Sequence, residues 1–203
     1  MIAKPFYGFG VDILQTQTPQ GYKNLYVAGA RFVGHYLGTF GQPVLDSIFD
    51  AGLLLWPIAG TARGGDWSIA TGQSDAEATL AAAKALGLPP GISITLDLES
   101  ADPDAMSVGA ATAYAVANGN LINASNFIAE LYPGAGCPLD GEQLYALPQK
   151  GYVQACSEGY TVPCGYKIIQ GHPGDVLFAG ITVDLDLAQQ DYRGRLPVLV
   201  AGG

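Results

Sequence analysis

Apolar residues gather in short runs along the chain, and most runs are bounded by glycine, proline or polar residues. Eight runs have the length and the β-branched or aromatic content of a strand. They are Phe6–Asp12, Ala30–Leu37, Gly52–Ala59, Ile92–Glu99, Asn126–Tyr132, Gly151–Cys156, Gly165–Gln170 and Gly180–Asp186. We therefore expect eight strands.

Alanine-rich segments between these runs predict helices. The clearest is Ser74–Gly87, where Ser74 is a candidate N-cap with Glu77 three residues on, and Gly87 ends the pattern. A second covers Asp104–Asn118. Shorter helices are expected over Pro43–Ala51 and Gly141–Leu147, whereas Leu14–Gly21 is interpreted as a polar loop.

The alternation of strands and helices indicates a parallel sheet, and eight strands indicate a closed barrel. The 203 residues have room for one sizeable core, and no Gly/Ser/Pro-rich linker divides them. We therefore predict an α/β fold, a compact (β/α)8 TIM-like barrel with shortened crossovers, as one domain over residues 1–203.

Two carboxylates close the fourth strand. Side chains alternate faces along a strand, so Asp97 and Glu99 point the same way with Cβ atoms about 6–7 Å apart, while Leu96 and Leu98 face the apolar side. Such a pair repels and is partly out of water, so one member is expected to hold its proton near neutral pH. Glycosidic bond cleavage uses this pairing, although a strand end whose acids cap the next helix has the same sequence.

Other acids and several aromatic residues also fall near predicted strand ends. In a barrel the active site is built at the carboxyl ends of the strands. The candidates for acid chemistry are Asp12, Asp97, Glu99, Asp184 and Asp186, and the aromatic residues expected on the same rim to stack on sugars are Tyr36, Trp56, Trp67 and Tyr132. Each residue alone is weak evidence, but the set is not one that a stability-driven core would choose.

Charge excludes one class of function. Eighteen acids against nine Lys and Arg give a net charge of −9 with no basic run, so nucleic acid binding is not expected. The same charge opposes attraction to an anionic cell wall, so a partner domain or assembly would have to supply targeting. No stretch has the length of a membrane span or the pattern of a signal peptide, and we expect synthesis in the cytoplasm.

The three cysteines do not have the spacing of a metal site, and neither a metal nor a cofactor is expected. Cys156 and Cys164 flank a turn-rich loop that would let them pair in oxidising surroundings, leaving Cys137 free. Two free thiols are an equally good interpretation.

The order of these pieces resembles the family-25 glycoside hydrolases, which are lysozymes, and a related group of bacterial glycoside-hydrolase-like domains. The similar segments are Gly10–Gln17, Gly72–Glu77 leading into Ile94–Glu99, Leu131–Gly134, Ile168–Gln170 and Gly180–Asp186. Arg31–Gly38 is closer to the glycoside-hydrolase-like group.

The resemblance implies roles for the acids. Glu99 matches the general acid and Asp97 the acidic partner that stabilises positive charge, while Asp12 and Asp184 match supporting acids. Gln170 and Asp186, with the four aromatic residues, are the candidate substrate-binding residues.

Two functions follow as hypotheses. The first is a muramidase-like hydrolase cutting β-1,4 bonds of an N-acetylated glycan such as peptidoglycan, acting at the cell wall as a phage endolysin or after export by another route. The alternative is a non-catalytic glycan-binding or structural barrel module of a phage particle or secreted assembly. Retention of both Asp97 and Glu99 favours the enzyme, whereas the negative charge and the third-strand ending Trp56-Pro57 favour the module.

Overall fold

The computed structural model describes residues 1–60, 66–100, 106–156, 161–171 and 174–203. Its helices are α1 (Pro19–Val27), α2 (Gln42–Asp50), α3 (Ile69–Ala85), α4 (Val108–Ala124) and α5 (Gly141–Tyr145). Its strands are β1 (Ile2–Pro5), β2 (Gly8–Asp12), β3 (Phe32–Tyr36), β4 (Leu54–Ala59), β5 (Ser93–Leu98), β6 (Ile128–Pro133), β7 (Gly151–Gln154), β8 (Ile168–Gln170), β9 (Val176–Phe178), β10 (Ile181–Ala188) and β11 (Val198–Ala201).

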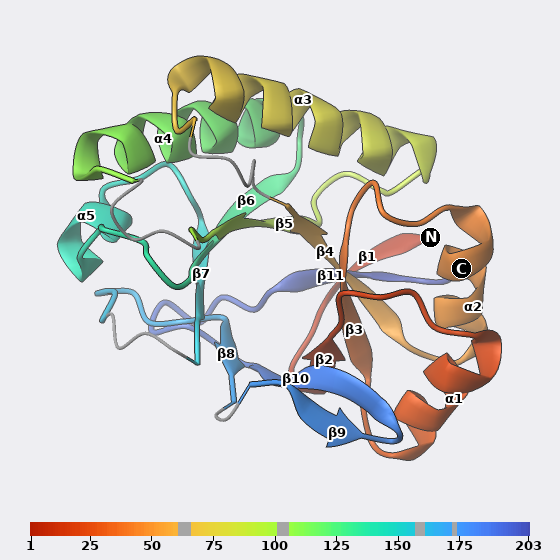
Figure 1. Ribbon diagram of the computed structural model, residues 1–203. Helices are drawn as coiled ribbons and strands as arrows, with labels where there is room; N and C mark the ends of the chain where they lie inside the picture. The colour runs from red at the N-terminus through yellow and green to blue at the C-terminus, as the bar shows by residue number, and fades with distance from the viewer. Residues whose placement is uncertain (61–65, 101–105, 157–160, 172–173) are drawn as a thin grey trace.

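Eight of these strands close into a barrel, as the sequence predicted. Their order is β4-β3-β2-β10-β8-β7-β6-β5, and pairing of β5 with β4 closes the ring. Helices α3 and α4 lie side by side on one flank, and α1 and α2 pack on another (Figure 1). The fold is therefore a TIM-like barrel.

The last barrel strand departs from the all-parallel pattern. β2 to β8 pair in parallel, but β10 is antiparallel to both of its neighbours, β2 and β8. The short strand β9 precedes β10 and forms a hairpin with it. A parallel strand would need a helical crossover at this point instead. Asp184 and Asp186 were expected at the carboxyl end of their strand, and this was wrong. They reach the other acids because the strand is reversed, which sets Asp184 opposite Asp12.

Two helix starts also differ from the prediction. Helix α1 begins inside the expected polar loop, where Thr18 accepts a hydrogen bond from the Gly21 amide and Pro19 takes the first helical position. Helix α3 begins with a capping box of Ser68 and Thr71 rather than at Ser74. The expected start of the second long helix at Asp104 lies outside the described residues, and α4 runs from Val108 to Ala124.

Two apolar cores lie on the two faces of the barrel wall. Outward side chains such as Val33, Leu55 and Leu96 pack against the helices. Inward side chains such as Phe32 and Trp56 fill the barrel interior together with Leu199 and Ala201 of β11. Strands β1 and β11 pair with each other beside the start of β4. They cover this end of the barrel, which we call the lower end, and leave the opposite end open as the mouth.

None of the described helices has the length and apolar character needed to cross a membrane.

Candidate active site

Strand β5 delivers Asp97 and Glu99 to the mouth. Leu96 and Leu98 pack in the outer core, so the alternate residues face the barrel interior as predicted. Asp97 is buried, and its Oδ2 accepts a hydrogen bond of 2.9 Å from the Tyr36 hydroxyl on β3. Glu99 is half-buried just beyond the end of the strand, at the rim. One carboxyl is thus fixed inside the mouth, while the other remains open to an incoming molecule.

A second group of acids faces them from β2 and β10. Asp12 pairs with Asp184 across the two antiparallel strands, and Asp186 lies one step deeper opposite Gly10. We call the five acids together the acid mouth: Asp12, Asp97, Glu99, Asp184 and Asp186. The sequence predicted that these five acids gather at one mouth. The structure brings them together from β2, β5 and β10.

Two members of the acid mouth have raised pKa values. Burial, together with the neighbouring Asp184 carboxylate, raises the pKa of Asp12 to about 7. Burial, and then the charge of Asp12, raises the pKa of Asp186 well above its usual range. Near neutral pH both carboxyls therefore carry less negative charge than an ordinary aspartate does.

Gln170 on β8 links the two groups of acids. Its Nε2 donates to Asp184 Oδ2 at 2.9 Å and to Asp12 Oδ2 at 3.3 Å. Its Oε1 accepts from the Tyr132 hydroxyl at 2.9 Å and from the Cys156 amide at 3.1 Å. Both amide hydrogens and both oxygen lone pairs of Gln170 are therefore engaged within the protein, and its substrate-binding role stays a prediction.

Tyr132 stands between the acids of β5 and Gln170. Burial and the nearby charges of Glu99 and Asp97 raise the pKa of the Tyr132 phenol, so it stays protonated and remains a hydrogen-bond donor. This phenol extends the polar network from β5 to β8.

Two glycines make room for this arrangement. A Cβ on Gly34 would lie 2.6 Å from both Asp12 Cβ and Trp56 Cε3. A Cβ on Gly134 would lie 2.5 Å from the Tyr132 ring and 3.1 Å from Glu99 Cβ. The sequence shows that Gly34 interrupts the strand pattern, but it does not show that Asp12 and Trp56 approach this glycine. Glycine within a strand is the signal for such a close approach.

Two aromatic residues predicted on the rim lie elsewhere. Trp56 is 2% exposed inside the barrel, where its indole N–H donates to Thr95 Oγ1 at 2.8 Å. Trp67 is 6% exposed outside the barrel and packs edge-on against Tyr114 of α4. Because one lies inside the barrel and the other outside it, neither can stack on a sugar at the mouth. The sequence alone does not distinguish a core tryptophan from a rim tryptophan. Tyr36 and Tyr132 do lie at the mouth.

The predicted disulfide is absent, because Cys156 and Cys164 are free thiols. Cys156 lies beside Asp184 and Gly174 at the mouth, a placement that the sequence analysis missed. Cys164 is buried in the outer core near Arg195 and Asp191. The two side chains thus belong to opposite faces of the barrel wall.

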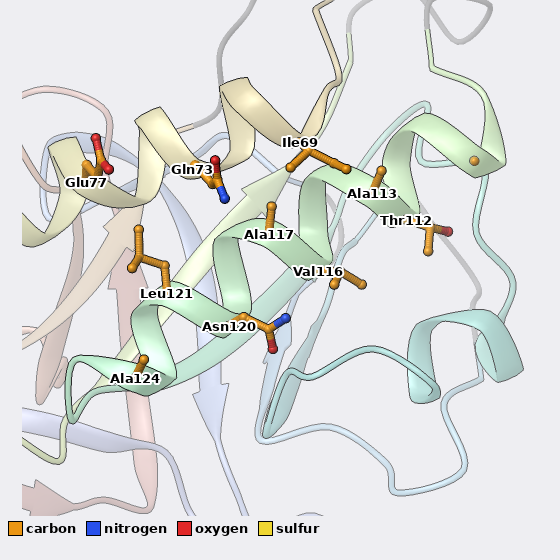
Figure 2. Close-up of a pocket in the computed structure, with 11 residues that line it drawn as sticks. Ile69, Gln73, Glu77, Thr112, Ala113, Val116, Ala117, Asn120, Leu121 and Ala124 are labelled. Carbon is orange, nitrogen blue, oxygen red and sulfur yellow. The ribbon is translucent and has the colours of Figure 1, made fainter.

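A separate groove of about 900 Å³ lies on the outer surface of α3 and α4 (Figure 2). Small and apolar residues such as Ala113, Val116 and Ala117 form most of its lining, with Glu77 as its one acid. None of the acid-mouth residues lines it. Among the residues that the structure describes, no group of three or more His, Cys, Asp or Glu side chains is arranged to hold a metal ion. The candidate active site is therefore the acid mouth.

A TIM-like barrel that gathers carboxyl groups from several strands at one mouth defines the class of glycoside-hydrolase-like domains. The chain belongs to the family described as Rv2525c-like, glycoside hydrolase-like domain, whose sequence profile matches residues 23–157. That range includes Asp97 and Glu99. No curated protein matches the chain significantly.

Solved structures share the fold at low sequence identity. The Tat-secreted protein Rv2525c of Mycobacterium tuberculosis, in complex with L-tartrate, is 16% identical with a TM-score of 0.68, over 94% of this chain and 99% of that one. The spore cortex lytic enzyme SleM of Clostridium perfringens is 12% identical with a TM-score of 0.64, over 97% and 72%. A bacterial lysozyme from Streptomyces coelicolor is 12% identical with a TM-score of 0.60, over 91% and 93%.

Proposed function

We propose that this chain is a glycoside hydrolase that cleaves β-1,4 bonds of an N-acetylated glycan such as peptidoglycan. The observation that carries the proposal is the acid mouth itself, in which a buried Asp97 and a rim Glu99 lie on one strand and face the acids of β2 and β10. The lysozyme and the cortex lytic enzyme among the structural neighbours support a cell-wall glycan as substrate.

In this proposal Glu99 is the general acid. Its position at the rim lets it reach the oxygen of the scissile bond, to which it donates a proton as the bond to the anomeric carbon breaks. Asp97 is the carboxylate that faces the positive charge developing on the sugar ring, or that orients a substrate acetamide. The Tyr36 hydroxyl holds Asp97 in place by its hydrogen bond.

The β2 and β10 acids support the reaction without touching the scissile bond. Asp12 and Asp184 are both held by the Gln170 amide, and Asp186 lies one step deeper on β10. Their negative field stabilises a cationic transition state, which is the role that the resemblance gives to Asp12 and Asp184.

We also propose that the protein acts at the cell wall. Its net charge of −9 gives no electrostatic attraction to an anionic wall, so a partner domain or assembly would supply the targeting. Whether it reaches the wall as a phage endolysin or as an exported bacterial protein is a prediction on which the fold has no bearing.

The test compares Glu99→Gln with Glu77→Gln, since both remove one carboxylate and Glu77 is exposed on α3, away from the mouth. Reducing ends released from several purified peptidoglycans measure activity. We expect Glu99→Gln to reduce the rate by a factor on the order of 10²–10⁴ and Glu77→Gln to leave it unchanged. Equal activity of Glu99→Gln and the parent contradicts the assignment of the acid. A parent that binds these glycans but cleaves none supports the non-catalytic module instead.

A further inference from the structure

The hairpin of β9 and β10 extends the inner face of the barrel beyond the acid mouth. Pairing of Thr182 with Leu177 and of Val183 with Val176 continues β10 past the end of β2, where Asp184 meets Asp12 (Figure 1). Ala179 and Gly180 both adopt positive φ and turn the chain in two residues. The hairpin therefore stands as a wall on one side of the mouth.

One face of this wall is packed and the other is open. Phe178 contacts Phe9 edge-on with ring centroids 5.5 Å apart, and Val183 is buried in the outer core. Leu177 is 78% exposed, and Thr182 opposite it is exposed as well. The hairpin thus presents an apolar side chain that takes no part in packing the fold.

The open face is the one that carries the acids. Residues directly opposite in an antiparallel pair share a face, and so do residues two apart on one strand. Leu177 and Thr182 therefore continue the row that Asp184 and Asp186 occupy inside the barrel.

The hairpin is also tied to the site by a hydrogen bond. The Asp175 amide, at a residue with φ of 55°, donates to Asp184 Oδ1. Positive φ at the non-glycine residues Asp175 and Ala179 is a backbone cost that the surroundings must hold in place. Anything that binds the wall therefore contacts a segment held in fixed relation to the acid mouth.

The chemistry of the open face fits a sugar better than a charged ligand. We call Leu177 and Thr182 the rim patch; neither side chain is charged, and Thr182 offers one hydroxyl. An N-acetylated sugar has the matching features, namely an acetamide methyl group and a C–H face with hydroxyl groups at its edge.

We propose that the rim patch is a sugar subsite of the acid mouth that recognises the acetamide methyl group of an N-acetylated glycan, with Leu177 as the residue that determines this preference. The inference rests on the proposed function and names the substrate feature that the site selects. Leu177 covers the methyl group, and Thr182 hydrogen-bonds to a sugar hydroxyl.

Glycan binding to the Glu99→Gln protein tests the subsite, because this substitution removes turnover from the measurement. The probes are soluble glycan strands prepared from peptidoglycan, either fully N-acetylated or chemically de-N-acetylated. In this background we expect Leu177→Ala to weaken binding of the acetylated strand about tenfold, as for loss of a small apolar contact, and to leave binding of the de-acetylated strand nearly unchanged. Leu187→Ala is the matched control, since Leu187 is 41% exposed on the opposite face of β10.

The outcomes separate the two proposals. If Glu99→Gln prefers acetylated strands and Leu177→Ala keeps that preference, the subsite is overturned while the glycosidase proposal stands. If neither the parent nor Glu99→Gln binds or cleaves any glycan, the proposed function falls and the subsite with it. Loss of the preference in Leu177→Ala but not in Leu187→Ala supports the subsite.

Discussion

The barrel interior treats buried acids in two different ways. Near its lower end Glu130 is fully buried, and its Oε1 accepts from Lys167 Nζ at 2.7 Å and from Ser93 Oγ at 2.7 Å. At the mouth, Asp12, Asp184 and Asp186 have no ion-pair partner among the residues that the structure describes, and the donors to Asp12 and Asp184 are amides. A stability-driven fold pairs a buried acid with a cation, so acids held by neutral donors indicate a site kept for chemistry.

The largest expected effect comes from breaking the compensated pair. Lys167→Met keeps the apolar stem but leaves Glu130 buried without its cation, which costs about 3–5 kcal/mol of unfolding free energy. Urea unfolding measures it, with Lys150→Met on the surface as the control. The double variant Lys167→Met/Glu130→Leu should recover most of the loss. If Lys167→Met were as stable as the parent, the ion pair of Lys167 and Glu130 would be dispensable for stability.

The acids at the mouth, which have no cation beside them, predict that the stability of the protein depends on pH. Because burial raises the pKa of Asp12 to about 7, the folded protein holds protons that the unfolded chain releases near pH 4. The stabilisation from Asp12 and Asp186 is thus present at low pH and lost as pH rises toward 7 and above, by at most about 1.4 kcal/mol per pH unit for each group. Urea midpoints across this range measure the decline.

The variant Asp12→Asn/Asp186→Asn should flatten that decline. Asp46→Asn/Asp50→Asn, which changes two exposed or partly exposed acids on α2, serves as the control and should keep the parental slope. A parental slope in the mouth variant would show that the raised pKa values of these two carboxyls do not cause the decline.

The smallest expected effect tests the connection between the acids of β5 and those of β2 and β10. Tyr132→Phe removes the hydroxyl that donates to Gln170 Oε1 and should cost about 1 kcal/mol of unfolding free energy. We also expect the pH dependence of stability to shift, since Gln170 holds Asp12. Tyr192→Phe is the control, because that side chain is 83% exposed. An unchanged pH dependence would mean that Gln170 is held without Tyr132.

Much of the barrel could be predicted from the sequence because its signals are local. Alternation along β5 predicted that Asp97 and Glu99 face away from Leu96 and Leu98, and apolar runs located the other strands. The direction of β10 could not be predicted in this way, since a strand has the same alternation whether it runs parallel or antiparallel. The turn at Ala179 and Gly180 was the one local indication of a hairpin.

The site was predictable in its residue types but not in its contacts. The position of Trp67 depends on Tyr114, and the role of Gln170 depends on four partners from distant segments. The raised pKa values of Asp12 and Asp186 arise from a strand pairing that spans most of the chain. Such properties belong to tertiary packing and leave no local pattern.

The reversed strand also bears on the order in which the chain can fold. Asp12 is synthesised well before the β10 residues that pair with β2. Until residues 181–188 emerge from the ribosome, Asp12 can remain hydrated, and its carboxylate need not enter a low-dielectric interior. Within the eight-stranded ring, the pairing most distant in sequence is the one that brings the carboxylates of β2 and β10 together. A nascent barrel can thus complete its parallel strands before it meets the electrostatic cost of its own active site.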